Sequence, residues 1–193
     1  CRISDPGHFT RRVKRLGPSL SGSSIWRGLR SGLRTGRDVV IDSSLLAAWS
    51  RADSDADWSF PSSFHGYKVH VLLDRAARLP LCFLLSPANK NDLPFAYPLL
   101  WFGRFVLALP IHGVRAAGAY WGKALVHVSV TVLGAHPIIP FNRKKQPLAR
   151  GRHLVSWPLS YLARAIIERF FAAAKRSDGL DTTYRIGWDA VLL

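Results

Sequence analysis

The stretch YLARAIIERFFAAAK, residues 161–175, contains the only glutamate in the chain. On a helical wheel with Tyr161 at the origin, Arg164 lies near about 300°, Glu168 near about 340° and Lys175 near about 320°. These polar side chains therefore follow one line along a helix. The opposite side collects an apolar stripe that predicts burial against a core, made of Ala163, Ile166, Ile167, Phe170, Ala173 and Ala174. A solvated face with an Arg164–Glu168 pair is the simplest interpretation of the polar line, and a functional face is the alternative.

A second carboxylate follows a β-branched run. The segment DVVIDSS, residues 38–44, is typical of a buried strand and carries Asp42 before two hydroxyl side chains. Residues 49–63, WSRADSDADWSFPSS, predict a loop with three aspartates at alternate positions. This loop lacks the glycine and the terminal acid of a calcium loop, so we expect a solvated acidic loop rather than a cation site.

The remaining patterns predict an α/β fold with a mixed sheet. Two strands, 65–74 and 79–88, should pair as a hairpin through the turn-like DRAARLP. The other predicted elements are a helix at 91–102 capped by Asn91 or Asp92, a strand and turn at 112–120, a helix at 121–134, a strand at 136–142 and the Glu168 helix, which starts after Pro158 or Ser160.

Composition indicates an anionic partner. The 193 residues include 27 Lys and Arg against 12 Asp and Glu, a formal net charge of +15, and nucleic acid is the first candidate partner. Arg104, Pro98 and Pro110 interrupt the most apolar segment, so we expect no membrane span. Two cysteines, Cys1 and Cys82, make neither a disulfide framework nor a zinc site, which fits a reducing compartment.

The N-terminal residues predict a short basic helical arm. Residues 1–38 carry nine Lys or Arg and two acids, with glycine and serine scattered through GPSLSGSS. The chain has no methionine and begins with Cys1, so we expect it to be a fragment that lacks some N-terminal sequence.

The spacing Tyr161-x2-Arg164-x3-Glu168-x6-Lys175 resembles the Y-R-E-K signature of bacterial insertion-sequence transposases of the DDE type. VVIDSS resembles the segment that bears the first catalytic aspartate of this family, and DSDADWSF, the predicted hairpin and RSDGLDTTYRIGWDAVLL resemble other segments of it. The resemblance implies a ribonuclease H-like fold, in which helices flank a mixed sheet. It also implies a catalytic domain over residues 38–193, with residues 1–37 as the remnant of a DNA-binding or dimerisation region.

The resemblance further implies the chemistry of the site. Asp42 and Glu168 correspond to catalytic acids that bind Mg²⁺ or Mn²⁺, because in-line attack at phosphorus is assisted by two divalent ions held by hard oxygen ligands. The implied DNA-binding residues are Tyr161, Arg164 and Lys175. The basic run at 142–153, next to them in sequence, is expected to follow DNA through Arg143, Lys144, Lys145, Arg150 and Arg152, and a solvated basic face is the alternative. The implied partner is double-stranded DNA at the terminal inverted repeats of a transposon, bound by a homodimer in the bacterial cytoplasm, at the nucleoid.

One position departs from the family pattern. The second aspartate of the family lies three residues before a tyrosine, and the matching segment RAAGAY has Ala117 before Tyr120. No acid lies between Asp92 and Glu168, so we expect weak metal binding and impaired catalysis. The alternative functions are a catalytically inactive DNA-binding remnant that occupies or regulates transposon ends, and a stand-alone ribonuclease H-like nuclease.

Several polar residues have two interpretations. Asn89 and Asp92 match a recurrent family pattern, but an aspartate at 92 is also typical of a helix cap. Lys68 and His70 share one face of a strand and could approach the site. A structural role is the first expectation for His70, and phosphate binding is the alternative. The tryptophans are expected in the core, and no role is assigned to Trp49, Trp58 and Trp188.

Overall fold

The strand predicted at Asp42 is the centre of the sheet. The computed structural model describes residues 35–59, 63–140 and 165–177, so most of the predicted basic arm lies outside the described residues. Strand β1 (Asp38–Ala47) buries Val39, Val40 and Ile41 completely. β-Branched side chains pack well on a pleated surface, which is why this run forms a strand that is covered on both faces.

Six strands form one mixed sheet in which β1 has an antiparallel and a parallel neighbour. The other strands are β2 (Asp57–Ser59), β3 (Phe64–Asp74), β4 (Leu79–Pro87), β5 (Gly113–Ala116) and β6 (His136–Ile138). β3 pairs antiparallel with β1, β4 and β2, whereas β5 pairs parallel with β1 and with β6. The predicted β3–β4 hairpin is confirmed, and the short strand β2 lies inside a segment that was expected to be loop.

The helices follow the predicted order. They are α3 (Leu93–Trp101), which continues as the π-helical segment η1 (Phe102–Val106), the 3₁₀ turn η2 (Gly118–Tyr120), α4 (Lys123–Thr131) and α6 (Ala165–Ser177). In α4, the Ser129 and Thr131 hydroxyls donate to the carbonyls of Leu125 and His127, both at 2.8 Å. Such bonds are compatible with a helix that is rich in β-branched residues.

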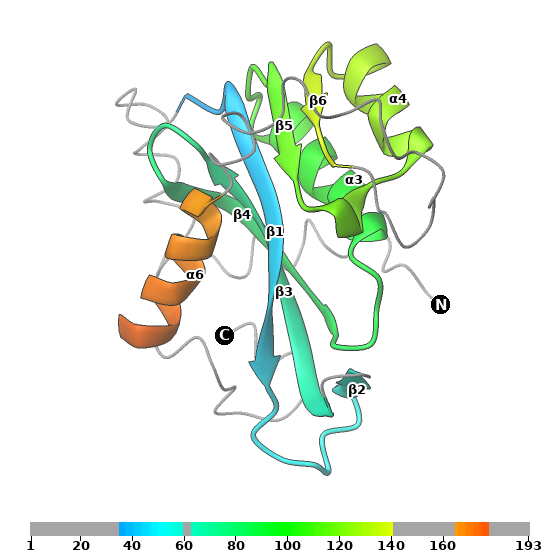
Figure 1. Cartoon of the computed structure of the whole chain (residues 1–193), viewed down its shortest axis with the longest axis vertical. Coiled ribbons are helices and arrows are strands. Elements are labelled where there is room, and N and C mark those ends of the chain that lie inside the picture. Colours follow the sequence, from blue (N-terminus) through cyan, green and yellow to red (C-terminus); the bar gives the residue numbers. More distant parts are fainter. Residues whose placement is uncertain (1–34, 60–62, 141–164, 178–193) are drawn as a thin grey trace.

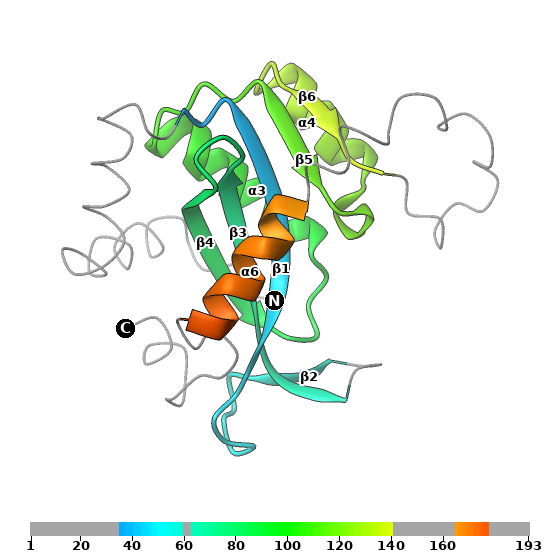
Figure 2. The same ribbon diagram turned by 60° about the vertical axis from the view of Figure 1, so that its left-hand side comes forward.

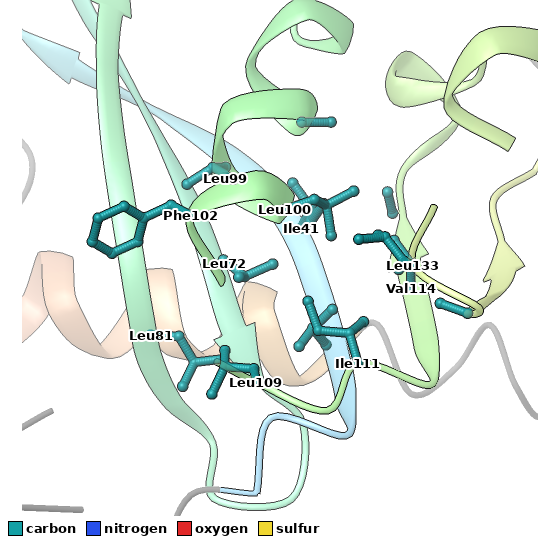
Figure 3. Packing of buried hydrophobic residues seen from close by; sticks show 14 of the residues in the cluster. Ile41, Leu72, Leu81, Leu99, Leu100, Phe102, Leu109, Ile111, Val114 and Leu133 are labelled. Carbon is teal, nitrogen blue, oxygen red and sulfur yellow. The ribbon is translucent and has the colours of Figure 1, made fainter. Parts of the chain in front are cut away.

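Helices cover both faces of the sheet, and Figures 1 and 2 show α6 across one face with α3 behind the other. On the α3 face, Val39, Ile41 and Leu72 pack in the larger hydrophobic cluster, which Figure 3 shows in close view with Leu99 and Leu100 of α3. This curled mixed sheet between helices confirms the predicted α/β fold class and is compatible with a ribonuclease H-like fold.

The α6 face has a smaller core. Val40, Val69, Val71 and Leu73 of β1 and β3 form one cluster with two α6 side chains, Ile167 and Phe171. Residues directly opposite in an antiparallel pair share a face. The pairs Val40–Leu73 and Asp42–Val71 therefore lie on the α6 side, and the pairs Ile41–Leu72 and Ser43–His70 lie on the α3 side.

The buried side of α6 differs from the predicted stripe. Ile167, Phe171 and Ala174 are buried, whereas Ala173, which was predicted in the stripe, is exposed. On the same wheel the buried residues centre near about 245°, rather than near about 180° as predicted. The prediction for Ala173 is therefore wrong, and the helix faces the sheet with the side nearer to its polar line.

Candidate functional site

Asp42 lies on the face of the sheet that α6 covers. It is half-buried in β1, two residues after Val40, which packs in the same cluster as Ile167 of α6. Successive side chains alternate between the faces of a strand, so Asp42 and Val40 point to the same side. The Ser43 backbone N–H donates to Asp42 Oδ1 at 2.9 Å, which orients the carboxylate.

Glu168 lies beside the buried contact of α6. Its neighbour Ile167 is fully buried against the sheet, and Glu168 itself is exposed. Because the buried side of α6 centres near about 245°, Glu168 lies about 95° from it, compared with about 160° from the predicted stripe. Glu168 is therefore at the edge of the covered face and on the same side of the sheet as Asp42. Lys175, on the same predicted line, is half-buried.

Ala117 follows the last residue pair between β1 and β5. That pair joins Ile41 to Ala116, so Asp42 and Ala117 are the next residues of the two parallel strands. Ala117 has an extended backbone, with φ −66° and ψ 161°, and its side chain packs in part against the α3-side core. A methyl group offers no oxygen to a metal ion, and the described part of the chain contains no group of three or more His, Cys, Asp or Glu residues placed to hold one.

Asp92 does not cap the helix that follows it. It occupies the N-cap position of α3, but its side chain makes no cap hydrogen bond. Instead, Asp92 Oδ1 lies 3.0 Å from Lys68 Nζ and accepts a hydrogen bond from Ser43 Oγ at 3.1 Å. Asp92 thus has the predicted N-cap position, but the predicted capping bond is absent, because long-range partners on β1 and β3 bond the carboxylate.

Lys68 and His70 share a face of β3, as predicted, but this is the α3 face and not the face of Asp42. Any approach of these two residues to the site would therefore be from the opposite face of the sheet. Lys68 Nζ also donates to the carbonyl of Lys90 at 2.8 Å, so its ammonium group has protein partners.

His70 is a structural residue. Its ring is fully buried, Nε2 lies 2.9 Å from Ser86 Oγ, Nδ1 lies 3.2 Å from the Tyr120 hydroxyl, and Phe95 stacks on the ring at 4.2 Å. Burial lowers the pKa of His70 to about 4, against an opposing effect of Asp92 and with a smaller contribution from Lys68. The imidazole is therefore neutral at pH 7.

In the sequence, Tyr120 is notable only as the tyrosine three residues after Ala117, whereas in the structure it is fully buried and its hydroxyl lies beside His70. Burial raises the pKa of Tyr120, and the Asp92 carboxylate raises it further, while a hydrogen bond with Ser43 opposes the shift. Its phenol therefore remains protonated and can donate. No sequence signal linked Ser43, Ser86 and Tyr120, because they come from three separate elements.

The aspartate-rich loop is a structural feature. Asp53 is buried, and its carboxylate accepts hydrogen bonds from the Tyr67 hydroxyl at 2.8 Å and from the Asp55 N–H at 3.2 Å. The Asn89 amide donates to the Asp57 carboxylate. The expected solvated acidic loop is thus wrong for Asp53, whose carboxylate fixes the loop to β3.

Three tryptophans lie at the surface instead of in the core, namely Trp49, Trp58 and Trp101, of which Trp101 is 50% exposed. Trp49 is 61% exposed and Trp58 is 37% exposed, and the Arg51 guanidinium lies 5.9 Å from the Trp58 ring centroid. Several predicted residues lie outside the described residues, namely Trp188, Tyr161, Arg164, Arg143, Lys144, Lys145, Arg150 and Arg152.

Among the helices of the described residues, none is long and apolar enough to span a membrane. No curated protein and no solved structure matches the chain. One protein family does match it: residues 34–193 fit the family described as "Transposase DDE domain". This range includes β1, the sheet and α6, which carry Asp42 and Glu168. The chain belongs to the DDE-domain transposase family.

Proposed function

We propose that this transposase domain acts at the ends of an insertion sequence, with Asp42 and Glu168 as catalytic acids of DNA strand cleavage and transfer. The observation that supports this proposal is the common side of the sheet: Asp42 is on the face of β1 that α6 covers, and Glu168 is at the edge of that face. The same proposal divides the chain into a basic arm, 1–37, and a catalytic domain, 38–193.

Asp42 and Glu168 would hold Mg²⁺ or Mn²⁺, since carboxylate oxygens are the ligands that these ions prefer. A bound ion of this kind stabilises charge on the attacking and leaving oxygens of a phosphoryl transfer. The fit is partial, because Ala117 contributes no oxygen at the position where the family pattern has an acid, and its side chain packs in part against the α3-side core rather than on the face of Asp42. We therefore propose that this chain binds metal weakly and that its catalysis is impaired.

The proposed DNA contacts extend from the Y-R-E-K helix to the basic run. Arg164 and Lys175 would counter phosphate charge, and Tyr161 would stack on a base or bond a phosphate. The basic run at residues 142–153, which precedes these residues in the sequence, would follow the DNA backbone. The proposed substrate is double-stranded DNA at terminal inverted repeats, bound by a homodimer at the bacterial nucleoid.

An inactive DNA-binding remnant is the second candidate, and Ala117 together with the net charge of +15 favours it. Such a protein would occupy or regulate transposon ends without cutting them. Both candidates predict DNA binding, but only the enzyme predicts that a restored acid brings back chemistry.

The test is Ala117→Asp, measured with DNA that carries the cognate ends. The unmodified chain should show little or no Mg²⁺-dependent cleavage or strand transfer, and Ala117→Asp should bind Mn²⁺ more tightly and recover some activity. Ala124→Asp adds the same charge at an exposed position of α4 and should have no effect. Adding Glu168→Gln to Ala117→Asp should abolish the gain, because an amide lacks the carboxylate charge. If the unmodified chain cleaves well and Ala117→Asp adds nothing, the assignment of Ala117 is wrong.

The DNA-binding part of the proposal is tested by salt titration. The logarithm of affinity should fall with the logarithm of salt concentration at a slope of about −0.9 per phosphate contact on duplex DNA. The double substitution Lys144→Ala/Lys145→Ala should make this slope shallower. The control is Lys90→Ala/Lys123→Ala, which removes two lysines that are exposed in the structure and should leave the slope unchanged. A slope near zero for the unmodified chain would refute DNA binding.

A further inference from the structure

A polar cluster on the α3 face of the sheet has no role in the proposed chemistry. It comprises Ser43, Lys68, His70, Ser86, Asp92 and Tyr120, and we call it the Asp92 cluster. We propose that the Asp92 cluster is a positioning device that holds two segments of the candidate site, β1 at Asp42 and the turn η2 that follows Ala117, in a set relative orientation. The inference rests on the proposed function for its catalytic meaning.

The first connection runs from the cluster to Asp42. Ser43 uses its two polar groups in different directions: its backbone N–H donates to Asp42 Oδ1 at 2.9 Å, and its hydroxyl donates to Asp92 Oδ1 at 3.1 Å. The side chains of Asp42 and Asp92 are on opposite faces of β1, and Ser43 links them through its own backbone and side chain. A shift of Asp92 therefore changes the position of the group that orients Asp42.

The second connection runs from the cluster to Ala117. The Tyr120 side chain is fully buried, and its hydroxyl lies 3.2 Å from His70 Nδ1. The Tyr120 backbone N–H donates to the Ala117 carbonyl at 3.0 Å, which closes the turn directly after Ala117. His70 lies opposite Ser43 in the β1–β3 ladder, so both connections meet at one place in the sheet.

Asp92 joins these connections to α3. An aspartate at the N-cap position usually bonds the backbone of its own helix, but the Asp92 carboxylate bonds Ser43 and Lys68, which are distant in sequence. Its Oδ1 is also 3.9 Å from His70 Nδ1. Apolar packing alone tolerates small shifts of the elements it joins, whereas hydrogen bonds in a buried network are directional. The cluster thus adds orientation to the contacts of the hydrophobic core.

Backbone amide hydrogen exchange tests the positioning without a metal, in variants that keep Ala117. The reporters are the backbone amides of Ser43 and Tyr120, which bond Asp42 and Ala117, with the Ile41 amide of the β1 ladder as the internal reference. In Asp92→Asn both reporter amides should exchange about five- to tenfold faster relative to Ile41, as expected when hydrogen bonds that hold them weaken. Tyr120→Phe removes only the hydroxyl oxygen, and it should accelerate exchange of the backbone amide at position 120 in the same way.

Tyr67→Phe is the matched control. Tyr67 is as fully buried as Tyr120, and its hydroxyl donates to Asp53 Oδ2 at 2.8 Å, outside the Asp92 cluster. Its loss should leave the two reporter amides unchanged relative to Ile41, although the melting temperature falls by a few degrees as in Tyr120→Phe. Two results in Asp92→Asn would overturn the proposal: exchange that speeds up equally at all amides, or exchange that does not speed up at the two reporters. Either result would show that the cluster only stabilises the fold.

Mn²⁺ affinity connects the positioning to the candidate site. In the Ala117→Asp background, adding Asp92→Asn should weaken Mn²⁺ binding by about tenfold, the effect typical of groups that orient metal ligands, and adding Tyr67→Phe should not. An equal effect of both additions would overturn the link between the cluster and the site. If Ala117→Asp itself binds Mn²⁺ no better than the unmodified chain, the proposed catalytic site fails, whereas the exchange ratios still decide whether the cluster orients the two segments.

Discussion

Replacing Ile167 with alanine tests the contact on which the candidate site depends. Ile167 is fully buried and packs in the cluster formed by Val40, Val69, Val71, Leu73 and Phe171. The substitution removes three carbons, a transfer loss of about 2.4 kcal/mol at about 0.8 kcal/mol for each. A cavity term adds to this loss, and the higher helix propensity of alanine offsets a few tenths of a kcal/mol. We expect a total loss of about 2–4 kcal/mol.

The assay is urea unfolding followed by circular dichroism, with the slope m compared between variants. Arg169→Ala is the control, because Arg169 is exposed on the same helix two positions later and should change stability by less than about 0.5 kcal/mol. Since the α6-side cluster is small, hydrogen exchange in α6 should also rise more than in β1 or β3. A loss below about 1 kcal/mol for Ile167→Ala, or equal values for the two variants, would refute the packing of α6 against Val40 and with it the common side of Asp42 and Glu168.

Two further predictions concern burial. Because the pKa of His70 falls from 6.5 to about 4 on folding, the unfolded chain binds more protons between these values. Stability should therefore drop as pH falls through this window, by at most about 3–4 kcal/mol. His70→Gln should lose this pH dependence, and His127→Gln, at an exposed site, should keep it. A flat profile for the unmodified chain would contradict the neutral buried imidazole. Ala174→Asp should destabilise the chain strongly because Ala174 is 7% exposed, and Ala173→Asp, at an exposed position, should change stability little. Equally strong destabilisation by both substitutions in urea unfolding would restore the predicted stripe, which includes both alanines.

The sequence alone determined the main elements because the signals are local. The β-branched run at Val39–Ile41 predicts a buried strand, and the two apolar segments around DRAARLP predict a hairpin. In that turn, Asp74 Oδ1 accepts hydrogen bonds from the N–H groups of Ala76 and Ala77, at 2.8 and 3.1 Å. An aspartate that bonds the backbone two residues later is a turn signal that needs no tertiary partner. The spacing around Glu168 is local in the same sense, and the resemblance drawn from it and from neighbouring segments predicts the family that the match over residues 34–193 shows.

Tertiary structure decided which side of each element is buried and which partners the polar groups take. A helical wheel places Ala173 and Phe171 relative to each other, but only docking against Val40 and Leu73 selects Phe171 for the core. The N-cap position of Asp92 is visible in the sequence, yet its carboxylate bonds Ser43, 49 residues away, and Lys68 instead of its own helix. Periodicity and capping patterns describe only a few neighbouring residues. The donors that bond a carboxylate such as Asp92 come within hydrogen-bond distance only when the sheet is folded.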